Sequence, residues 1–147
     1  MHNFDKKRGF MIENKKEKYW NKYAYGYDEG VDYVVGKALN KTIIEKLSSE
    51  HLGEVVEYGC GSGYFTKAIA SNAKHIIATD ISDEMLEMAK VKLSELNNVT
   101  IEKADCENSS IPSEKCDCVS MANLIHDGFV KSPISVLRCI PRNFTYS

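Results

Sequence analysis

The sequence lacks a long apolar run and a strong net charge, and both absences exclude classes of protein. No stretch of the 147 residues approaches the length of a membrane-spanning helix, and the N-terminus lacks the apolar core of a signal peptide. The formal net charge is −2, which gives no general attraction to nucleic acid or to an anionic membrane. We therefore expect a cytoplasmic protein that binds neither nucleic acid nor membranes.

The cysteines do not form an evident paired set. There are five of them, an odd number without a secretion signal, which argues against a disulfide framework. Cys116 and Cys118 have a C-x-C spacing that metal sites use, but the sequence contains no second pair of this kind. We expect these thiols to pack as small buried side chains and predict no metal site.

Strand-like and helix-like segments alternate along the chain, which has about the length of one domain. This alternation indicates a parallel sheet with helical crossovers. Helical periodicity is found at 31–47, 65–69 and 82–96, and another helix is expected to begin at 134–138. Strand patterns are found at 55–56, 75–79, 99–102 and 117–121.

The most specific signal is the run from Glu54 to Lys67, EVVEYGCGSGYFTK. It predicts a strand, an acidic residue, a glycine-rich turn and a helix start. Glycines permit a tight turn and let a ligand lie against bare backbone, and the helix N-terminus offers unpaired N–H groups. Asp80 ends the next apolar run, where its carboxylate can accept hydrogen bonds from both hydroxyls of a ribose. Together these features predict a nucleoside-binding βαβ unit.

The glycine spacing distinguishes between two kinds of nucleoside-binding unit. A dinucleotide fold has G-x-G-x-x-G, whereas this turn reads G-x-G-x-G and has Tyr64 in place of the third glycine. The motif EYGCGSG is followed in order by ATDISDEML, KADCENSSIP and CDCVSMANLIHD. These four stretches resemble the motifs of the class I S-adenosylmethionine-dependent methyltransferases, of the type that acts on small molecules. The resemblance covers roughly residues 20 to 138. It implies an α/β fold with a Rossmann-like, doubly wound parallel sheet, and S-adenosylmethionine as the cofactor.

The resemblance also implies which residues bind the methionine part and the ribose of the cofactor. Glu57 would help to hold the ammonium group, or else would support the turn by packing. Asp80 would bind the ribose. The turn would approach the cofactor through the backbone of Gly59, Cys60, Gly61 and Gly63.

Further residues of these motifs would bind the adenine. Ile81 and Met85 resemble the apolar residues that sandwich the ring, although both are also suited to ordinary core positions. Asp105 would accept a hydrogen bond from the exocyclic amine, and the N–H of Cys106 would donate to a ring nitrogen. A surface turn is the alternative for this pair.

The remaining candidates flank the cofactor motifs. The aromatic segment 20–28, including Tyr27, resembles a segment that folds over the cofactor, but it could also pack without touching a ligand. Asn123 and His126 follow the fourth strand at the family's active-site rim. His126 is the candidate catalytic residue because the ordinary pKa of histidine lies near neutrality. Since methyl transfer from a sulfonium needs in-line positioning more than acid–base help, a packing role for His126 stays open.

The C-terminal part departs from the family pattern. Family members have seven strands, and about four are identifiable before Ser147, because the segment CIPRNFTYS does not continue the expected helix and strand. We expect a basic N-terminal arm (1–18), a cofactor-binding methyltransferase domain (19–140) and a tail outside the pattern (141–147). An incomplete sheet would leave an edge open to self-association.

Three functions follow from these patterns. The preferred one is methyl transfer to a small-molecule acceptor. The alternative is a non-catalytic, nucleoside-binding fragment or partner subunit. Tyr64 disfavours a nicotinamide-dependent oxidoreductase.

Overall fold

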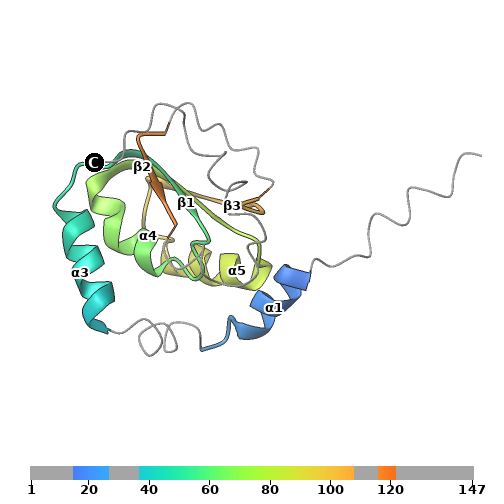
Figure 1. Ribbon diagram of the computed structural model, residues 1–147. Helices are drawn as coiled ribbons and strands as arrows, with labels where there is room; N and C mark the ends of the chain where they lie inside the picture. Colours follow the sequence, from blue (N-terminus) through green and yellow to red (C-terminus); the bar gives the residue numbers. More distant parts are fainter. Residues whose placement is uncertain (1–14, 27–36, 108–115, 122–147) are drawn as a thin grey trace, which may run out of the picture.

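The computed structural model describes residues 15–26, 37–107 and 116–121, which form one layer of strands covered by helices (Figure 1). The strands are β1 (Gly53–Tyr58), β2 (Ala73–Asp80), β3 (Val99–Lys103) and β4 (Cys118–Ser120). All pairs are parallel, and the order across the sheet is β3-β2-β1-β4. The predicted α/β class with a Rossmann-like parallel sheet is confirmed.

The strand order reverses beside β1. The chain proceeds from β1 through β2 to β3 on one side of the sheet, and β4 then pairs with the opposite side of β1. In open α/β sheets, ligands bind outside the carboxyl ends of the strands at such a reversal, because the adjacent loops there turn away from each other. The residues that end β1 and β2 are therefore the first place to look for a site.

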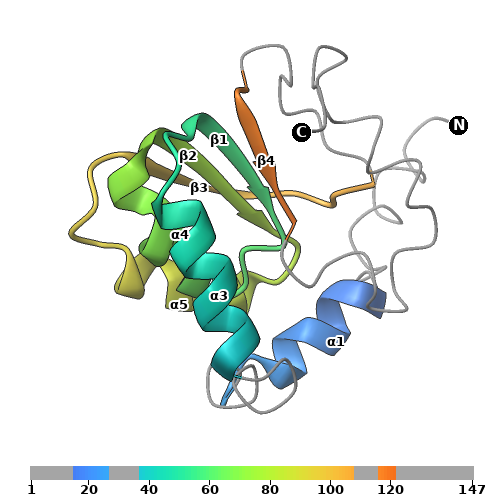
Figure 2. The same ribbon diagram turned by 60° about the vertical axis from the view of Figure 1, so that its left-hand side comes forward.

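The helices of the described part are α1 (Lys15–Tyr23), α3 (Lys37–Ser48), α4 (Tyr64–Ile69) and α5 (Asp83–Lys92), with a single turn η2 (Ala70–Asn72) after α4. Figures 1 and 2 show α3, α4 and α5 along the same side of the sheet, with α1 beside α5. Residues 31–36 of one predicted helix, and the helix expected from 134, lie outside the described ranges. The predicted boundary between arm and domain, after residue 18, falls inside α1. None of these helices has the length and apolar character that a membrane crossing requires.

The core lies between the sheet and α4 and α5. Residues 55–58 of β1 are all buried, as expected for a strand that lies between two others in a parallel sheet. Ile76 and Ala78 of β2 pack with Ile69 and Leu86 from the two crossover helices. This packing fixes the carboxyl ends of β1 and β2 side by side.

The start of α5 follows the prediction from its sequence. Ser82 is the N-cap, and its hydroxyl accepts a hydrogen bond from the Met85 N–H at 3.2 Å. Asp83 and Glu84 occupy the first turn, where carboxylates complement the helix dipole. Because Ser82 comes two residues after the end of β2, the cap fixes the short connection that carries Asp80 and Ile81.

Candidate functional site

The glycine-rich turn lies at the carboxyl end of β1. Gly59, Gly61 and Gly63 have φ angles of 68°, 55° and 87°, a region that residues with a side chain rarely adopt. The Cys60 N–H donates to the carbonyl of Thr79 in β2 at 2.9 Å, and the Gly63 N–H donates to the carbonyl of Cys60 at 3.0 Å. The turn is therefore tight and is attached to the neighbouring strand.

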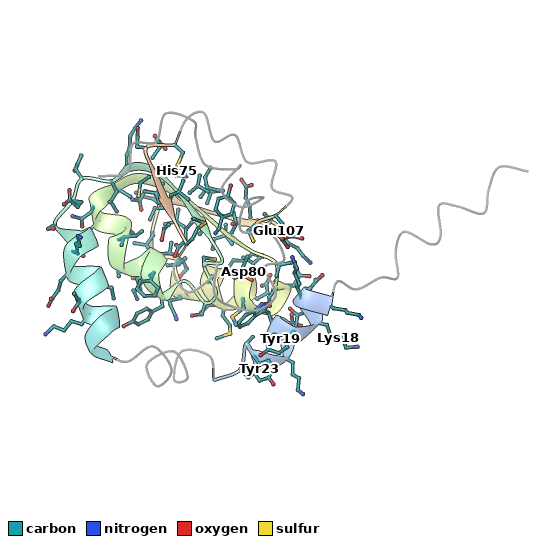
Figure 3. The ribbon with its side chains drawn as sticks, in the orientation of Figure 1. Lys18, Tyr19, Tyr23, His75, Asp80 and Glu107 are labelled. Atoms are coloured by element: carbon teal, nitrogen blue, oxygen red, sulfur yellow. The ribbon has the colours of Figure 1, made fainter. Side chains whose placement is uncertain are left out.

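Asp80 joins this turn to the start of α5. Its Oδ2 accepts from the Gly61 N–H at 2.9 Å, and its Oδ1 accepts from the Ser82 N–H at 2.9 Å. The residue is only 9% exposed and lies at the end of β2 (Figure 3). The two backbone contacts fix the orientation of the carboxylate. A carboxylate has roughly four acceptor sites, and it is chemically suited to accept hydrogen bonds from hydroxyl groups.

Glu57 is a second buried carboxyl group in the same region, at 1% exposure in β1. Burial raises its pKa from an ordinary 4.5 to about 7; the hydrogen bond from Thr66 opposes this rise, and the charge of Asp80 adds to it. The Thr66 hydroxyl donates to Oε2 of Glu57 at 2.5 Å. A cation bound beside the two carboxyl groups would be stabilised by both and would lower the pKa of Glu57.

Thr66 is a residue of this site that no sequence motif indicated. Thr66 lies in the first turn of α4, three residues after the last glycine of the motif. A hydroxyl residue at that spacing after the glycines faces back toward the strand. That spacing is the signal by which the contact to Glu57 could have been found.

Cys60 contributes through its backbone. Burial, followed by the charges of Asp80 and Glu57, raises the pKa of its thiol well above the ordinary value. The thiol is therefore protonated and unreactive at neutral pH. Cys118 begins β4 and Cys116 lies two residues before it; both are half-buried, and burial raises the pKa of both thiols. In the described ranges, no three His, Cys, Asp or Glu side chains are grouped so that they could hold a metal ion.

The predicted adenine residues lie at the same edge of the sheet as Asp80. The Ala104 N–H donates to the Asp80 carbonyl at 3.0 Å, so the segment after β3 runs beside the end of β2. Asp105 and Cys106 follow directly and are half-buried, as is Ile81, whereas Met85 is fully buried in α5. The structure thus brings the ribose and adenine candidates together.

The remaining candidates lie outside the described residues. They are Tyr27, Asn123 and His126. The roles assigned to them stay predictions.

Helix α1 places part of the aromatic segment near this edge. The Tyr19 ring packs on those of Trp20 and Tyr23, with centroids 5.2 and 4.6 Å away. The Asn21 side chain contacts the Ser82 hydroxyl, with 2.6 Å between the two oxygen atoms. The family resemblance placed segment 20–28 over the cofactor, but no local signal indicated the contact of Asn21 with Ser82, because the two residues are 61 positions apart.

The known proteins to which this chain is similar include methyltransferases. A family model described as a methyltransferase domain matches residues 55–142. An uncharacterized methyltransferase of Anoxybacillus flavithermus is 30% identical over 118 residues, covering 79% of this chain and 52% of the relative. The ribosomal RNA small subunit methyltransferase A of Enterococcus faecalis is 26% identical over 123 residues, covering 84% of this chain and 39% of the relative.

A solved structure of DhpI in complex with SAH, the demethylated form of S-adenosylmethionine, is also similar. It has a TM-score of 0.60 and 25% identity, covering 71% of this chain and 50% of DhpI. The chain thus spans about half the length, or less, of the curated relatives that it matches.

Proposed function

The chain belongs to the class I S-adenosylmethionine-dependent methyltransferases, and from this premise we propose that it binds S-adenosylmethionine and transfers the methyl group to a small-molecule acceptor. The family predicted from the glycine motif is confirmed by the family match, and S-adenosylmethionine is the cofactor of that family. The observation that carries the proposal is the Asp80 carboxylate, which Gly61 and Ser82 orient at the reversal of strand order.

The residues present fit the chemical groups of the cofactor. Asp80 would accept hydrogen bonds from the ribose hydroxyls, and Glu57 would hold the ammonium group. Asp105 would accept from the exocyclic amine of adenine, and the Cys106 N–H would donate to the ring. Ile81 would give the adenine apolar contact, whereas the fully buried Met85 suits the ordinary core position that the sequence left open for it. The bare backbone of the glycine turn would permit close approach.

When bound, S-adenosylmethionine supplies a methyl group on a sulfonium sulfur. Direct displacement would pass this methyl group to a lone pair of the acceptor and would leave S-adenosylhomocysteine, and the acceptor's proton would go to a base or to solvent. Positioning of the acceptor supplies most of the acceleration in such a displacement. His126 stays the candidate base.

A nucleic-acid acceptor is the second candidate, because several relatives, from Enterococcus, Staphylococcus and Clostridium, are named as ribosomal RNA small subunit methyltransferase A. Proteins that bind RNA direct lysines and arginines toward phosphates. In this chain the net charge is −2, and the carboxyl edge carries Asp80, Asp83, Asp105 and Glu107. Two lysines of that edge, Lys16 and Lys103, pair with carboxylates of the chain itself. These charges favour a small molecule as the acceptor.

Binding and transfer are tested separately. Titration calorimetry should show that the purified chain binds S-adenosylhomocysteine and that NAD does not compete. Labelled S-adenosylmethionine is then incubated with a metabolite fraction and with ribosomal RNA, and label should move to the metabolite fraction. Label on RNA would support the second candidate. Binding without transfer to either would support the non-catalytic alternative, and absence of binding would refute the proposal.

Self-association through a sheet edge also stays a proposal. Sedimentation velocity of the purified chain over a range of concentrations tests it. A constant monomer mass would contradict it.

A further inference from the structure

We propose that Lys16 is a positioning residue for adenine recognition. It holds the Asp105 carboxylate where this group can accept a hydrogen bond from the exocyclic amine of adenine. The inference rests on the proposed function, because Asp105 is assigned to adenine there. It adds a residue from α1, outside the four sequence motifs, to the determinants of cofactor specificity.

The first observation is the environment of the Lys16 ammonium group. It forms an ion pair with Glu107, and it lies 3.6 Å from Oδ1 of Asp105. The three side chains are 15%, 11% and 21% exposed, respectively. Burial lowers the pKa of Lys16, but the hydrogen bond to Glu107 and the charge of Asp105 outweigh it and raise the pKa above the ordinary value. The group therefore stays charged between its two carboxylates.

The second observation concerns the orientation of Asp105. The Glu107 N–H donates to Oδ1 of Asp105 at 3.1 Å, and the Lys16 ammonium approaches the same oxygen. A backbone donor and a cation thus act on one carboxylate oxygen. Without the cation, the like charges of Asp105 and Glu107 would repel each other, and the largely buried Glu107 would lose its ion pair with Lys16. The turn that carries Asp105 would then rearrange, and adenine would lose a directed acceptor.

The third observation is that α1 has other attachments to the same edge. Glu17 pairs with Lys103 of β3 at 2.5 Å, and Asn21 contacts Ser82 before α5. Figure 3 shows Glu107 between the end of β3 and α1. Because these attachments do not involve Asp105, a change at Lys16 alters the adenine turn while α1 keeps other contacts. Lys16 can therefore be tested separately from the docking of α1.

The experiment compares two ligands, S-adenosylhomocysteine and its analogue with purine in place of adenine, which lacks the exocyclic amine. Affinities are measured by calorimetry for the wild type, Lys16→Met and Lys16→Arg. We expect the wild type to prefer the adenine ligand by about tenfold, the size of one directed contact. Lys16→Met should reduce this preference to about twofold or less by weakening only the adenine ligand, and Lys16→Arg, which keeps the cation, should retain it.

Two control variants test alternative explanations. Lys15→Met removes an exposed lysine from the same helix and should leave the preference unchanged. Glu17→Gln removes a different attachment of α1, so it should also leave the preference unchanged even if α1 becomes less stable.

The possible failures are distinguishable. If the wild type binds neither ligand, the proposed function is wrong and the inference falls with it. If the wild type binds S-adenosylhomocysteine but Lys16→Met weakens both ligands equally or neither, the proposed function stands and the role of Lys16 is refuted. The same conclusion holds if the wild type has no preference, or if Glu17→Gln abolishes the preference as Lys16→Met does.

Discussion

The Gly61 N–H donates to Oδ2 of Asp80 at 2.9 Å, across 19 residues of sequence. This hydrogen bond joins the glycine-rich turn after β1 to the acidic end of β2. It means that the carboxylate expected to bind a ribose also holds the turn on which the rest of the cofactor would lie. Substitutions at Asp80 therefore affect both the shape of the turn and the affinity for ligand.

The first prediction concerns Asp80→Asn, which keeps the size of the side chain and removes its charge. Binding of S-adenosylhomocysteine should weaken by about 2–3 kcal/mol, because a charge-assisted pair of hydroxyl contacts is lost. Titration calorimetry measures the change. Glu84→Gln, which neutralises an exposed carboxylate in the first turn of α5, is the matched control and should bind as the wild type does. Equal affinity of wild type and Asp80→Asn would remove the ribose assignment.

The second prediction concerns the dependence of stability on pH. The pKa of Glu57 is raised by burial from 4.5 to about 7 in the folded state. A raised folded-state pKa contributes stability that is fully present below pH 4.5 and is lost as the pH rises through 7. The loss amounts to about 3 kcal/mol for a shift of this size.

Glu57→Gln isolates this contribution, because glutamine is neutral throughout and its carbonyl can still accept from Thr66. Urea unfolding from pH 5 to pH 8 should show the wild type losing stability relative to Glu57→Gln. If the free energy of unfolding changed with pH in the same way in both proteins, Glu57 would be ionised in the folded state at every pH from 5 to 8.

The third prediction links the same residue to ligand binding. An ammonium group held by Glu57 would lower the pKa of this carboxyl group, so binding below pH 7 should release a proton. Calorimetry of S-adenosylhomocysteine binding at pH 6, in buffers with different ionisation enthalpies, measures the release. The affinity of the wild type should rise from pH 5 to pH 8. A wild type that releases no more protons than Glu57→Gln would place the ammonium group elsewhere.

The fourth prediction compares two glycines in the left-handed region. An added Cβ at Gly63, with φ of +87°, would lie 2.9 Å from Leu93 Cδ1, whereas at Gly26, with φ of +77°, it would meet nothing within 4 Å. Both alanine variants carry about 1 kcal/mol of backbone strain, and Gly63→Ala should lose a further 1–3 kcal/mol, roughly, through overpacking. Urea unfolding measures the difference.

The double variant Gly63→Ala with Leu93→Ala provides the control for this clash. Removing the Leu93 side chain relieves the contact, so the two substitutions should destabilise by less than the sum of their separate effects. Strict additivity, or equal losses for Gly63→Ala and Gly26→Ala, would show that the turn accommodates a Cβ without crowding.

Local signals in the sequence determined much of the fold. Alternating strand and helix patterns indicated the parallel sheet, and Ser82 marked the start of α5 because capping depends on neighbours within one helical turn. The glycine motif and Asp80 indicated where a ligand would bind, since the family pattern consists of short segments. These features depend on residues near one another in the chain.

Only the tertiary structure decided the position of β4 beside β1, the buried contact of Thr66 with Glu57 and the pairing of Lys16 with Glu107 across 91 residues. Burial and long-range pairing arise from packing, and a pKa near 7 for Glu57 follows from that burial. The sequence determined which chemical groups are present at the site. Packing determined their distances and charges, because electrostatic energy depends on separation and on exclusion of water.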